Sequence, residues 1–287
     1  MQENTLKIAI QKSGRLSEQS IALIKECGIQ FNNAVGKLTA SANNYPIEIL
    51  FLRDDDIPGY VTDGVADIGI VGENVLLEKQ VSVKTILQLG FGKCRLSLAV
   101  PKALEYKSLK DLSKHKIATS YPNILSDFLK SNNIEATIHE ISGSVEIAPS
   151  IGLADAICDL VSSGSTLLSN GLKEVETVLK SQAVLVANNN LSAEKEKQLD
   201  DLLFRIKAVQ AAKNNKYILL NAPNTAISEI TDVLPGIKSP TVVPLADSGW
   251  SSIHSVVNEN EFWQIIDKLK AAGAQGILVV PIEKMIV

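Results

Sequence analysis

Apolar and amphipathic segments alternate along the first two-thirds of the chain. The short apolar runs are typical of buried strands, and the segments between them have the spacing of amphipathic helices. The predicted strands include residues 6–10, 47–53, 66–72, 94–101 and 116–122. Because strands that alternate with helices build sheets covered by helices, the pattern predicts parallel sheets of the α/β class.

Polar residues mark the ends of the predicted helices. Ser17 is placed to cap a helix over residues 17–28, which Gly28 would end. The acids of Asp54–Asp56 lie at the start of the next helix, where the helix dipole favours negative charge. These signals fix the approximate positions of the first two helices.

Two stretches of the chain share one pattern. Residues 63–76 (DGVADIGIVGENVL) and 151–167 (IGLADAICDLVSSGSTL) each contain a Gly, an Ala-Asp pair, an apolar strand, a Gly-containing turn and a helix start. The shared pattern suggests two lobes of similar build. Because ligands of α/β proteins bind at the carboxyl ends of parallel strands, we expect a ligand cleft between the lobes.

The last third of the chain changes character. A long, charged amphipathic helix ends near residue 214. Segments in the order strand, helix, strand, strand, helix, strand then follow from residue 216 to residue 282. This order is that of a ferredoxin-like unit. By analogy of fold, a small module of this kind behind two ligand-binding lobes has a regulatory or oligomerising role.

Residues 154–167 carry the strongest chemical signal. A carboxylate inside an apolar strand needs a partner, and the two hydroxyls of a ribose would suit Asp159 at the strand's end. The following turn, Ser163–Thr166, can present backbone N–H groups and hydroxyls to an anion. Together these features predict a site for a ribose 5-phosphate. The alternative is that the turn is only a helix cap and Asp155 only a solvated acid.

Other residues near predicted strand ends extend this site. Lys12 and Arg15 follow the first strand and Arg53 closes the second. Three cations at one cleft mouth suit a second anion such as a diphosphate, while each alone could be ordinary surface charge. Tyr121 could stack on a base or be a rim residue of the core. The three histidines are isolated, so the sequence offers no triad for nucleophilic catalysis.

Composition narrows the class of protein. Of the 287 residues, 45% are hydrophobic and 21% are charged, which is the balance of a soluble globular protein. The net charge of −4 argues against a nucleic-acid partner. Neither a membrane-spanning run nor a secretory leader is recognisable. Three widely separated cysteines predict buried, reduced thiols, so we expect a cytoplasmic protein.

Several motifs together resemble one enzyme family. They are LKIAIQKSGRL, RDDDIPGYVTDGVADIGIVGENVL, CRLSLA, KIATSYP, GSVEIAPSIGLADAICDLVSSGSTL and SPTVVPLAD, which extend nearly from end to end. The sequence is similar to the ATP phosphoribosyltransferase family in its long form, which has a C-terminal regulatory domain. The resemblance implies two periplasmic-binding-protein-like lobes forming a cleft, plus a ferredoxin-like βαββαβ domain. The lobes would be residues 1–92 with 176–212 and residues 93–175, and the regulatory domain residues 213–287.

The same resemblance implies a reaction and the residues that serve it. The phosphoribosyl group of phosphoribosyl diphosphate would pass to N1 of ATP in the first step of histidine biosynthesis, with Mg²⁺ as cofactor and its ligands unassigned. Histidine would inhibit by feedback, and dimers would assemble into hexamers. The catalytic cations would be Lys12, Arg15 and Arg53. The substrate contacts would be Asp67, Tyr121, Glu146, Asp159, Ser163, Gly164, Ser165 and Thr166, and the histidine contacts Asn221, Thr241, Val256 and Gly276.

Proteins of other classes share this outline. Prephenate dehydratase, and small-molecule binding proteins with a sensor domain, also combine two lobes with a ferredoxin-like module. Neither needs a ribose-binding acid followed by a phosphate-binding turn, and the sequence contains no dehydratase motif of the Thr-Arg-Asp-Thr-Thr type.

Overall fold

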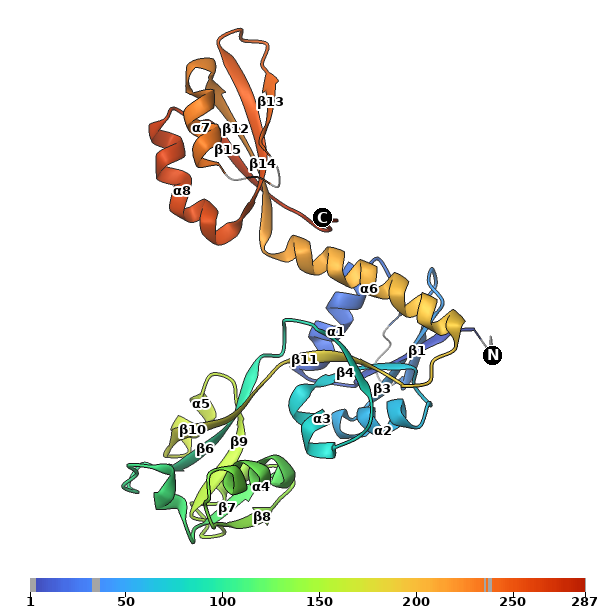
Figure 1. The fold of residues 1–287 in the computed structure, drawn as a ribbon, viewed down its shortest axis with the longest axis vertical. Coiled ribbons are helices and arrows are strands. Elements are labelled where there is room, and N and C mark those ends of the chain that lie inside the picture. The colour runs from blue at the N-terminus through green and yellow to red at the C-terminus, as the bar shows by residue number, and fades with distance from the viewer. Residues whose placement is uncertain (1–3, 33–36, 235, 237–238, 287) are drawn as a thin grey trace. The chain divides into compact units, whose positions relative to one another are not determined.

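Three β-sheets organise the chain. Its structure, a computed structural model, describes residues 4–32, 37–234, 236 and 239–286. Two sheets lie in one unit made of residues 1–25 and 29–199, and the third lies in a second unit made of residues 26–28 and 200–287. Within the first unit, extended segments join two α/β lobes (Figure 1). The predicted fold class is confirmed.

The first sheet has the strand order β2-β3-β1-β4-β11-β5. Strands β1, β3 and β4 are parallel, and the other three run antiparallel to their neighbours. Side chains on both faces of β1 and β4 are mostly buried. The strands are β1 (Leu6–Gln11), β2 (Thr39–Ser41), β3 (Ile47–Leu52), β4 (Ile68–Gly72), β5 (Lys84–Gln88) and β11 (Ala183–Ala187), and the helices are α1 (Arg15–Glu26), α2 (Ile57–Thr62) and α3 (Glu73–Lys79), with a 3₁₀ turn over Asp54–Asp56.

The second sheet has the strand order β10-β6-β9-β7-β8. Strands β7, β8 and β9 are parallel, β6 is antiparallel to β9, and β10 is antiparallel to β6. The elements are β6 (Cys94–Pro101), β7 (Lys116–Thr119), α4 (Pro122–Ser131), β8 (Thr137–Glu140), β9 (Ala156–Val161), α5 (Ser165–Ser169) and β10 (Leu172–Ser181), with 3₁₀ turns over Leu109–Leu112 and Val145–Ile147.

Both sheets are mixed, whereas the sequence pattern predicted parallel sheets. The chain enters the second lobe through β6 and leaves it through β10, so these two strands run in opposite directions and pair antiparallel. An apolar run does not reveal strand direction, because either direction buries the same side chains. The lobe boundary predicted at residue 175 falls inside β10, which pairs with β6 along its whole length.

The shared pattern in the sequence corresponds to the same strand in each lobe. Just before β4, the Asp67 Oδ2 atom accepts the backbone N–H of Lys7 at 2.8 Å. Just before β9, the Asp155 Oδ2 atom accepts the backbone N–H of Lys116, also at 2.8 Å. In both cases the N–H of the Asp returns a hydrogen bond to the carbonyl of the same lysine. The pattern therefore encodes a strand clamp, our name for this Asp–Lys pair, at the amino end of each central strand.

The first helix begins earlier than its predicted cap. Helix α1 starts at Arg15, directly after Gly14, whose φ of +89° favours glycine. Ser17 therefore lies inside the first turn, where it is buried and does not cap the helix. Gly28 follows the end of α1 with a φ of +78°, which is typical of a helix-terminating glycine.

The third sheet has the antiparallel order β13-β14-β12-β15, and α7 and α8 cover one of its faces (Figure 1). This is the ferredoxin-like arrangement that the order of elements predicted. No helix in the described ranges is both long and apolar enough to cross a membrane. The elements are α6 (Ala193–Lys213), β12 (Asn215–Pro223), α7 (Ile227–Val233), β13 (Thr241–Pro244), β14 (Trp250–Asn258), α8 (Glu259–Ala271) and β15 (Gln275–Pro281), with a 3₁₀ turn over Asn224–Ala226.

Candidate active site between the two lobes

Three exposed cations lie at the carboxyl ends of the first lobe's strands. Strands β1 and β3 end together, because the Lys12 N–H donates to the Leu52 carbonyl at 2.8 Å and Arg53 follows directly. Arg15, in the first turn of α1, reaches the second lobe and donates from Nη1 to Ser162 Oγ at 3.2 Å. The cations predicted from the sequence therefore line one edge of the sheet, and Arg15 contacts the segment that follows β9.

The turn after β9 is built as the sequence predicted. Strand β9 ends at Val161 and α5 begins at Ser165, with Gly164 between them at a φ of +82°. The Oγ atoms of Ser163 and Ser165 lie 3.0 Å apart, and Thr166 is exposed beside them. The turn therefore presents several hydroxyls at a strand end, where an anion can accept hydrogen bonds from them.

An ion pair in the sheet holds the start of this turn. Arg95 on β6 makes a bidentate pair with Glu174 on β10, and its Nη1 also donates to the Ser162 carbonyl at 3.2 Å. The guanidinium of Arg95 lowers the pKa of Glu174 below its usual range. Because a guanidinium bonds through a planar fork and does not lose its proton, the pair keeps the backbone of Ser162 in one position.

Two acids and a tyrosine gather at the same part of the cleft. Burial raises the pKa of the Asp159 carboxyl, the Leu160 N–H at 2.8 Å lowers it, and the nearby charge of Glu146 raises it again. Burial also raises the pKa of the Tyr121 phenol, with further contributions from the charges of Asp159 and Asp54. The structure thus groups Asp159, Glu146 and Tyr121 of the second lobe, with Asp54 of the first lobe near them.

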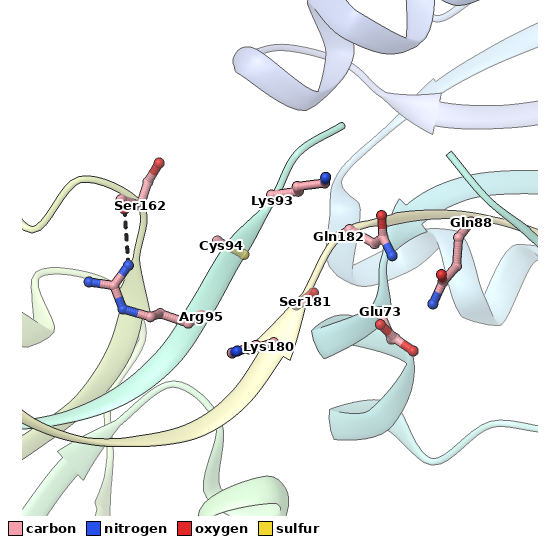
Figure 2. Close-up of a pocket in the computed structure, with 9 residues that line it drawn as sticks. All are labelled: Glu73, Gln88, Lys93, Cys94, Arg95, Ser162, Lys180, Ser181 and Gln182. Atoms are coloured by element: carbon pink, nitrogen blue, oxygen red, sulfur yellow. Dashed lines mark hydrogen bonds between the residues drawn. The ribbon is translucent and has the colours of Figure 1, made fainter. Parts of the chain in front are cut away.

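Two adjoining open cavities lie between the lobes. One, of about 310 Å³, is lined from both lobes by residues that include Arg15, Asn74 and Ser162. The other, of about 530 Å³, lies beside the paired strands β6 and β10, near the ends that lead to the first lobe. Lys180 on β10 and Arg95 on β6 are opposite each other in the strand register (Figure 2). Ser162 lines both cavities, so they meet at the start of the hydroxyl-rich turn.

Asp67 lies at the amino ends of the parallel strands of the first sheet, whereas the three cations of this site lie at the carboxyl ends. It precedes β4, where its carboxylate accepts the Lys7 N–H and makes a 2.8 Å ion pair with Lys195 Nζ. Lys12 lies beyond the other end of β1. Asp67 therefore does not join the nucleotide site that the resemblance implied. Its equivalence with Asp155, visible as the shared sequence pattern, was the signal that its role is structural.

Sequence reasoning missed three polar residues at the lobe junction, namely Asn74 and Glu78 on α3 and Ser181 at the end of β10. Asn74 bonds to Tyr121 and to Ser181, and Glu78 accepts N–H groups at the start of α4. The four-residue spacing of Asn74 and Glu78 places them on one face of a helix. That spacing was the available signal, and it does not say which distant segment the face will meet.

The acids of the cleft suit a metal shared with a substrate. In the described part of the chain, no cluster of three or more His, Cys, Asp or Glu side chains is arranged to hold a metal ion. Mg²⁺ commonly takes one or two carboxylates together with substrate phosphates and water. The neighbouring carboxylates of Asp159 and Glu146 fit this kind of site, in which the substrate supplies the remaining ligands.

The residues predicted to bind histidine lie in the second unit. Asn221 and Gly276 are neighbours on β12 and β15, and a Cβ at position 276 would lie 3.6 Å from Asn221 Nδ2. Thr241 is exposed on the edge strand β13. Asn221 is paired with Ser252 on β14. Val256 is four residues further along β14, so about 13 Å of strand separates it from Ser252. The sheet therefore brings Asn221 and Gly276 together and keeps Val256 apart from them.

Comparisons with known proteins identify the family. A family model described as ATP phosphoribosyltransferase matches residues 53–208, and a model of that family's C-terminal domain matches residues 212–284. An ATP phosphoribosyltransferase of Cytophaga hutchinsonii is 66% identical over 281 residues, which cover 98% of each chain. The chain belongs to the ATP phosphoribosyltransferase family. Another ATP phosphoribosyltransferase, of Phocaeicola vulgatus, is 58% identical over 281 residues, which cover 98% of this chain and 99% of the relative.

Solved structures agree with this family and with the fold of the lobes. The ATP phosphoribosyl transferase (HisG:HisZ) complex from Thermotoga maritima matches with a TM-score of 0.61 and 31% identity, covering 71% of this chain and 99% of that one. A substrate binding protein of an amino acid ABC transporter matches with a TM-score of 0.50 and 13% identity, covering 73% of this chain and 94% of that one. The second match concerns the fold alone, and it confirms the binding-protein-like lobes of this ATP phosphoribosyltransferase family member.

Proposed function

We propose that the chain transfers the phosphoribosyl group of phosphoribosyl diphosphate to N1 of ATP. The products are N1-(5-phospho-β-D-ribosyl)-ATP and diphosphate, and the reaction begins histidine biosynthesis. The observation that carries the proposal is the contact of Arg15, one of three cations on the first lobe, with Ser162, which leads into the hydroxyl-rich turn of the second lobe. Membership of the ATP phosphoribosyltransferase family supports the same conclusion.

The second lobe binds the sugar phosphate in this proposal. The raised pKa of Asp159 reflects a carboxylate that is poorly solvated, so hydrogen bonds from the two ribose hydroxyls stabilise its charge. The hydroxyls and N–H groups of the turn from Ser163 to Thr166 bind the 5-phosphate. Glu146 lies beside Asp159 and bounds the sugar site.

The first lobe stabilises the leaving group. As the bond from adenine N1 to the ribose C1 forms, the bond from C1 to the diphosphate breaks and its electron pair leaves with the diphosphate. Positive charge grows on the sugar and negative charge grows on the departing diphosphate. Lys12, Arg15 and Arg53 stabilise the negative charge of the diphosphate. Neutral N1 carries a lone pair and no proton, so the attack needs no general base. The lobes align the reactants and exclude water.

Mg²⁺ is the cofactor in this proposal, and Asp159 and Glu146 are the residues that would hold it. When bound, it neutralises charge on the leaving group. Because the protein supplies only part of the ligand set, metal affinity is expected to rise when phosphoribosyl diphosphate is present. Calorimetric titration of Mg²⁺ with and without that substrate measures the difference.

A spectroscopic assay tests the proposed reaction. The protein is mixed with ATP, phosphoribosyl diphosphate and Mg²⁺, and the ultraviolet spectrum is followed for an N1-substituted adenine. Inorganic pyrophosphatase is added to remove diphosphate and draw the reaction forward. Omission of phosphoribosyl diphosphate is the control. No spectral change in the complete, pyrophosphatase-coupled mixture would show that the chain is not this transferase.

We also propose that histidine binds the C-terminal unit and inhibits the enzyme. Asn221 and Gly276 are neighbours on β12 and β15, where the glycine has no side chain beside the Asn221 carboxamide, and the exposed Thr241 has a hydroxyl that can donate or accept. By linkage, histidine must favour a state that binds substrate less well. Thr241→Ala is expected to weaken histidine inhibition and to leave uninhibited turnover nearly intact.

Assembly and location complete the proposal. The sheet of the C-terminal unit exposes apolar side chains of β15, including Leu278 and Val280, which supports dimers that assemble into hexamers. Light scattering should show a smaller assembly when the chain is cut near Asn214, and a full-length monomer at micromolar concentration would contradict this. Cys27 and Cys158 are buried thiols without disulfides, which supports a reducing, cytoplasmic location.

A further inference from the structure

The junction of α3 with α4 joins the two lobes through groups that the mechanism above does not use. The backbone N–H groups of Asn123 and Ile124 donate to Glu78 Oε1 and Oε2 at 2.9 and 3.0 Å. The side-chain amide of Asn123 donates to the Glu78 carbonyl at 3.0 Å. Glu78 is only 8% exposed. A buried carboxylate with two N–H partners in the first turn of a helix is strongly held, so the start of α4 is tied to the first lobe.

Asn74 makes a second tie on the same face of α3. Its Nδ2 donates to Tyr121 Oη at 3.2 Å, and its Oδ1 accepts from Ser181 Oγ at 2.8 Å. The same Oγ accepts the backbone N–H of Asn74 at 3.1 Å, and Asn74 is 4% exposed. Position 72 must be glycine for this arrangement, because a Cβ there would lie 2.5 Å from Asn74 Oδ1. These contacts hold the carboxamide in one orientation.

This orientation decides what the Tyr121 phenol can do. Because the Asn74 amide donates to Oη, the phenol oxygen is an acceptor in this bond, and its own hydrogen is left to donate elsewhere. Burial and the charges of Asp159 and Asp54 raise the pKa of the phenol, so it keeps that hydrogen near neutral pH. Asn74, which holds the phenol oxygen, lines the smaller cavity between the lobes, so the phenol lies next to the cleft.

We propose that Asn74 and Glu78 are positioning residues for Tyr121, and that together they present its phenol as a hydrogen-bond donor to the nucleotide substrate. Glu78 fixes the helix that Tyr121 precedes, and Asn74 fixes the phenol itself. The inference rests on the proposed function, because that function supplies the nucleotide. It assigns no contact with substrate to Asn74 or Glu78, so both act through Tyr121.

A double-mutant cycle tests whether Asn74 acts through Tyr121. Asn74→Ala and Tyr121→Phe are each expected to raise KM for ATP roughly three- to tenfold, the effect of one lost hydrogen bond. KM for phosphoribosyl diphosphate should stay within about twofold. The double variant should be no worse than Tyr121→Phe alone. Additive effects of the two substitutions would overturn the proposal, because Asn74 would then act independently of the phenol.

Asn74→Asp separates orientation from shape. The carboxylate has the size of the carboxamide and still accepts from Ser181, but it takes the phenol hydrogen where the amide donated one. This variant should therefore show the same raised KM for ATP as Tyr121→Phe, with its fold checked by circular dichroism. A wild-type KM for ATP in folded Asn74→Asp would overturn the proposal.

Asn189→Ala is the matched control. Its Nδ2 also donates to a distant segment, to Ser82 O at 3.0 Å and Ser82 Oγ at 3.2 Å. Asn189 follows the end of β11, which pairs with the start of β4 and so lies away from the candidate site. Neither KM should change.

Glu78→Gln keeps the shape of the side chain but loses its charge, and it should raise KM for ATP selectively and by less than Asn74→Ala. Absent turnover by the wild type would contradict the proposed function. Wild-type turnover with an unchanged KM for ATP in Asn74→Ala would defeat this inference alone.

Discussion

The two lobes are alike at one end of their central strands and different at the other. At the amino ends, Asp67 and Asp155 make the same strand clamp. At the carboxyl ends, β4 continues directly into α3, whose Asn74 is buried at the lobe junction, whereas an exposed turn separates β9 from α5. The comparison teaches that the repeated fold keeps the contacts that align its strands and varies the segments that form the candidate site.

The largest expected effect comes from the variable end of β9. Asp159→Ala should raise KM for phosphoribosyl diphosphate tenfold or more, and KM for ATP far less, because a charged hydrogen-bond acceptor contributes about 1.5–3 kcal/mol. Steady-state kinetics with each substrate varied in turn measures both constants. Asp155→Ala, at the start of the same strand, is the control and should change neither. Unchanged kinetics in folded Asp159→Ala would remove the main support for the sugar site.

The clamps have the same geometry in both lobes and lie away from the candidate site. Substitution of a clamp Asp is therefore expected to destabilise the fold without weakening the binding of either substrate. Asp67→Ala should lower the free energy of unfolding by about 1–3 kcal/mol, because it leaves the N–H of Lys7 and the ammonium of Lys195 without their acceptor. Asp155→Ala should cost less, because Asp155 is exposed. Urea unfolding compares the two. A selective rise in KM for ATP in Asp67→Ala would instead return Asp67 to the nucleotide site.

Thr166→Ala sharpens the assignment of the turn. Loss of one hydroxyl donor to the 5-phosphate should raise KM for phosphoribosyl diphosphate by roughly two- to tenfold, which is less than for Asp159→Ala. Leu168→Ala, also exposed and within α5, is a matched control without a hydroxyl. If both substitutions have the same small effect, the turn does not hold the phosphate.

The smallest effect concerns the stability cost of Asp159 in the absence of substrate. Its folded-state pKa is raised, chiefly by burial, so ionisation destabilises the fold as pH rises from the unfolded pKa of about 3.9 through the folded one. Asp159→Asn should therefore melt at a higher temperature than wild type near neutral pH, and the difference should vanish below about pH 4. A melting difference that is the same at every pH would contradict this cause.

The elements that the sequence predicted well depend on neighbouring residues. The turn from Ser163 to Thr166 and the strand-helix order of residues 216–282 follow from local apolar spacing and from Gly and Ser positions. The start of α1 was misplaced by two residues, because Ser17 and the true start at Arg15 both lie near polar turn residues. Strand direction was also misjudged, since burial alone does not encode it.

The amino-acid sequence by itself determined the α/β lobes, the ferredoxin-like unit, and the turn beside Asp159, because each of these is written in local periodicity and turn chemistry. Only the tertiary structure decided the contacts of Asp67 and Asn74. The bonds of Asn74 span 47 residues to Tyr121 and 107 to Ser181, and the ion pair of Asp67 spans 128 residues to Lys195. Local patterns carry no information over such separations, because the partner of a polar side chain is set by which distant strands the sheets bring together.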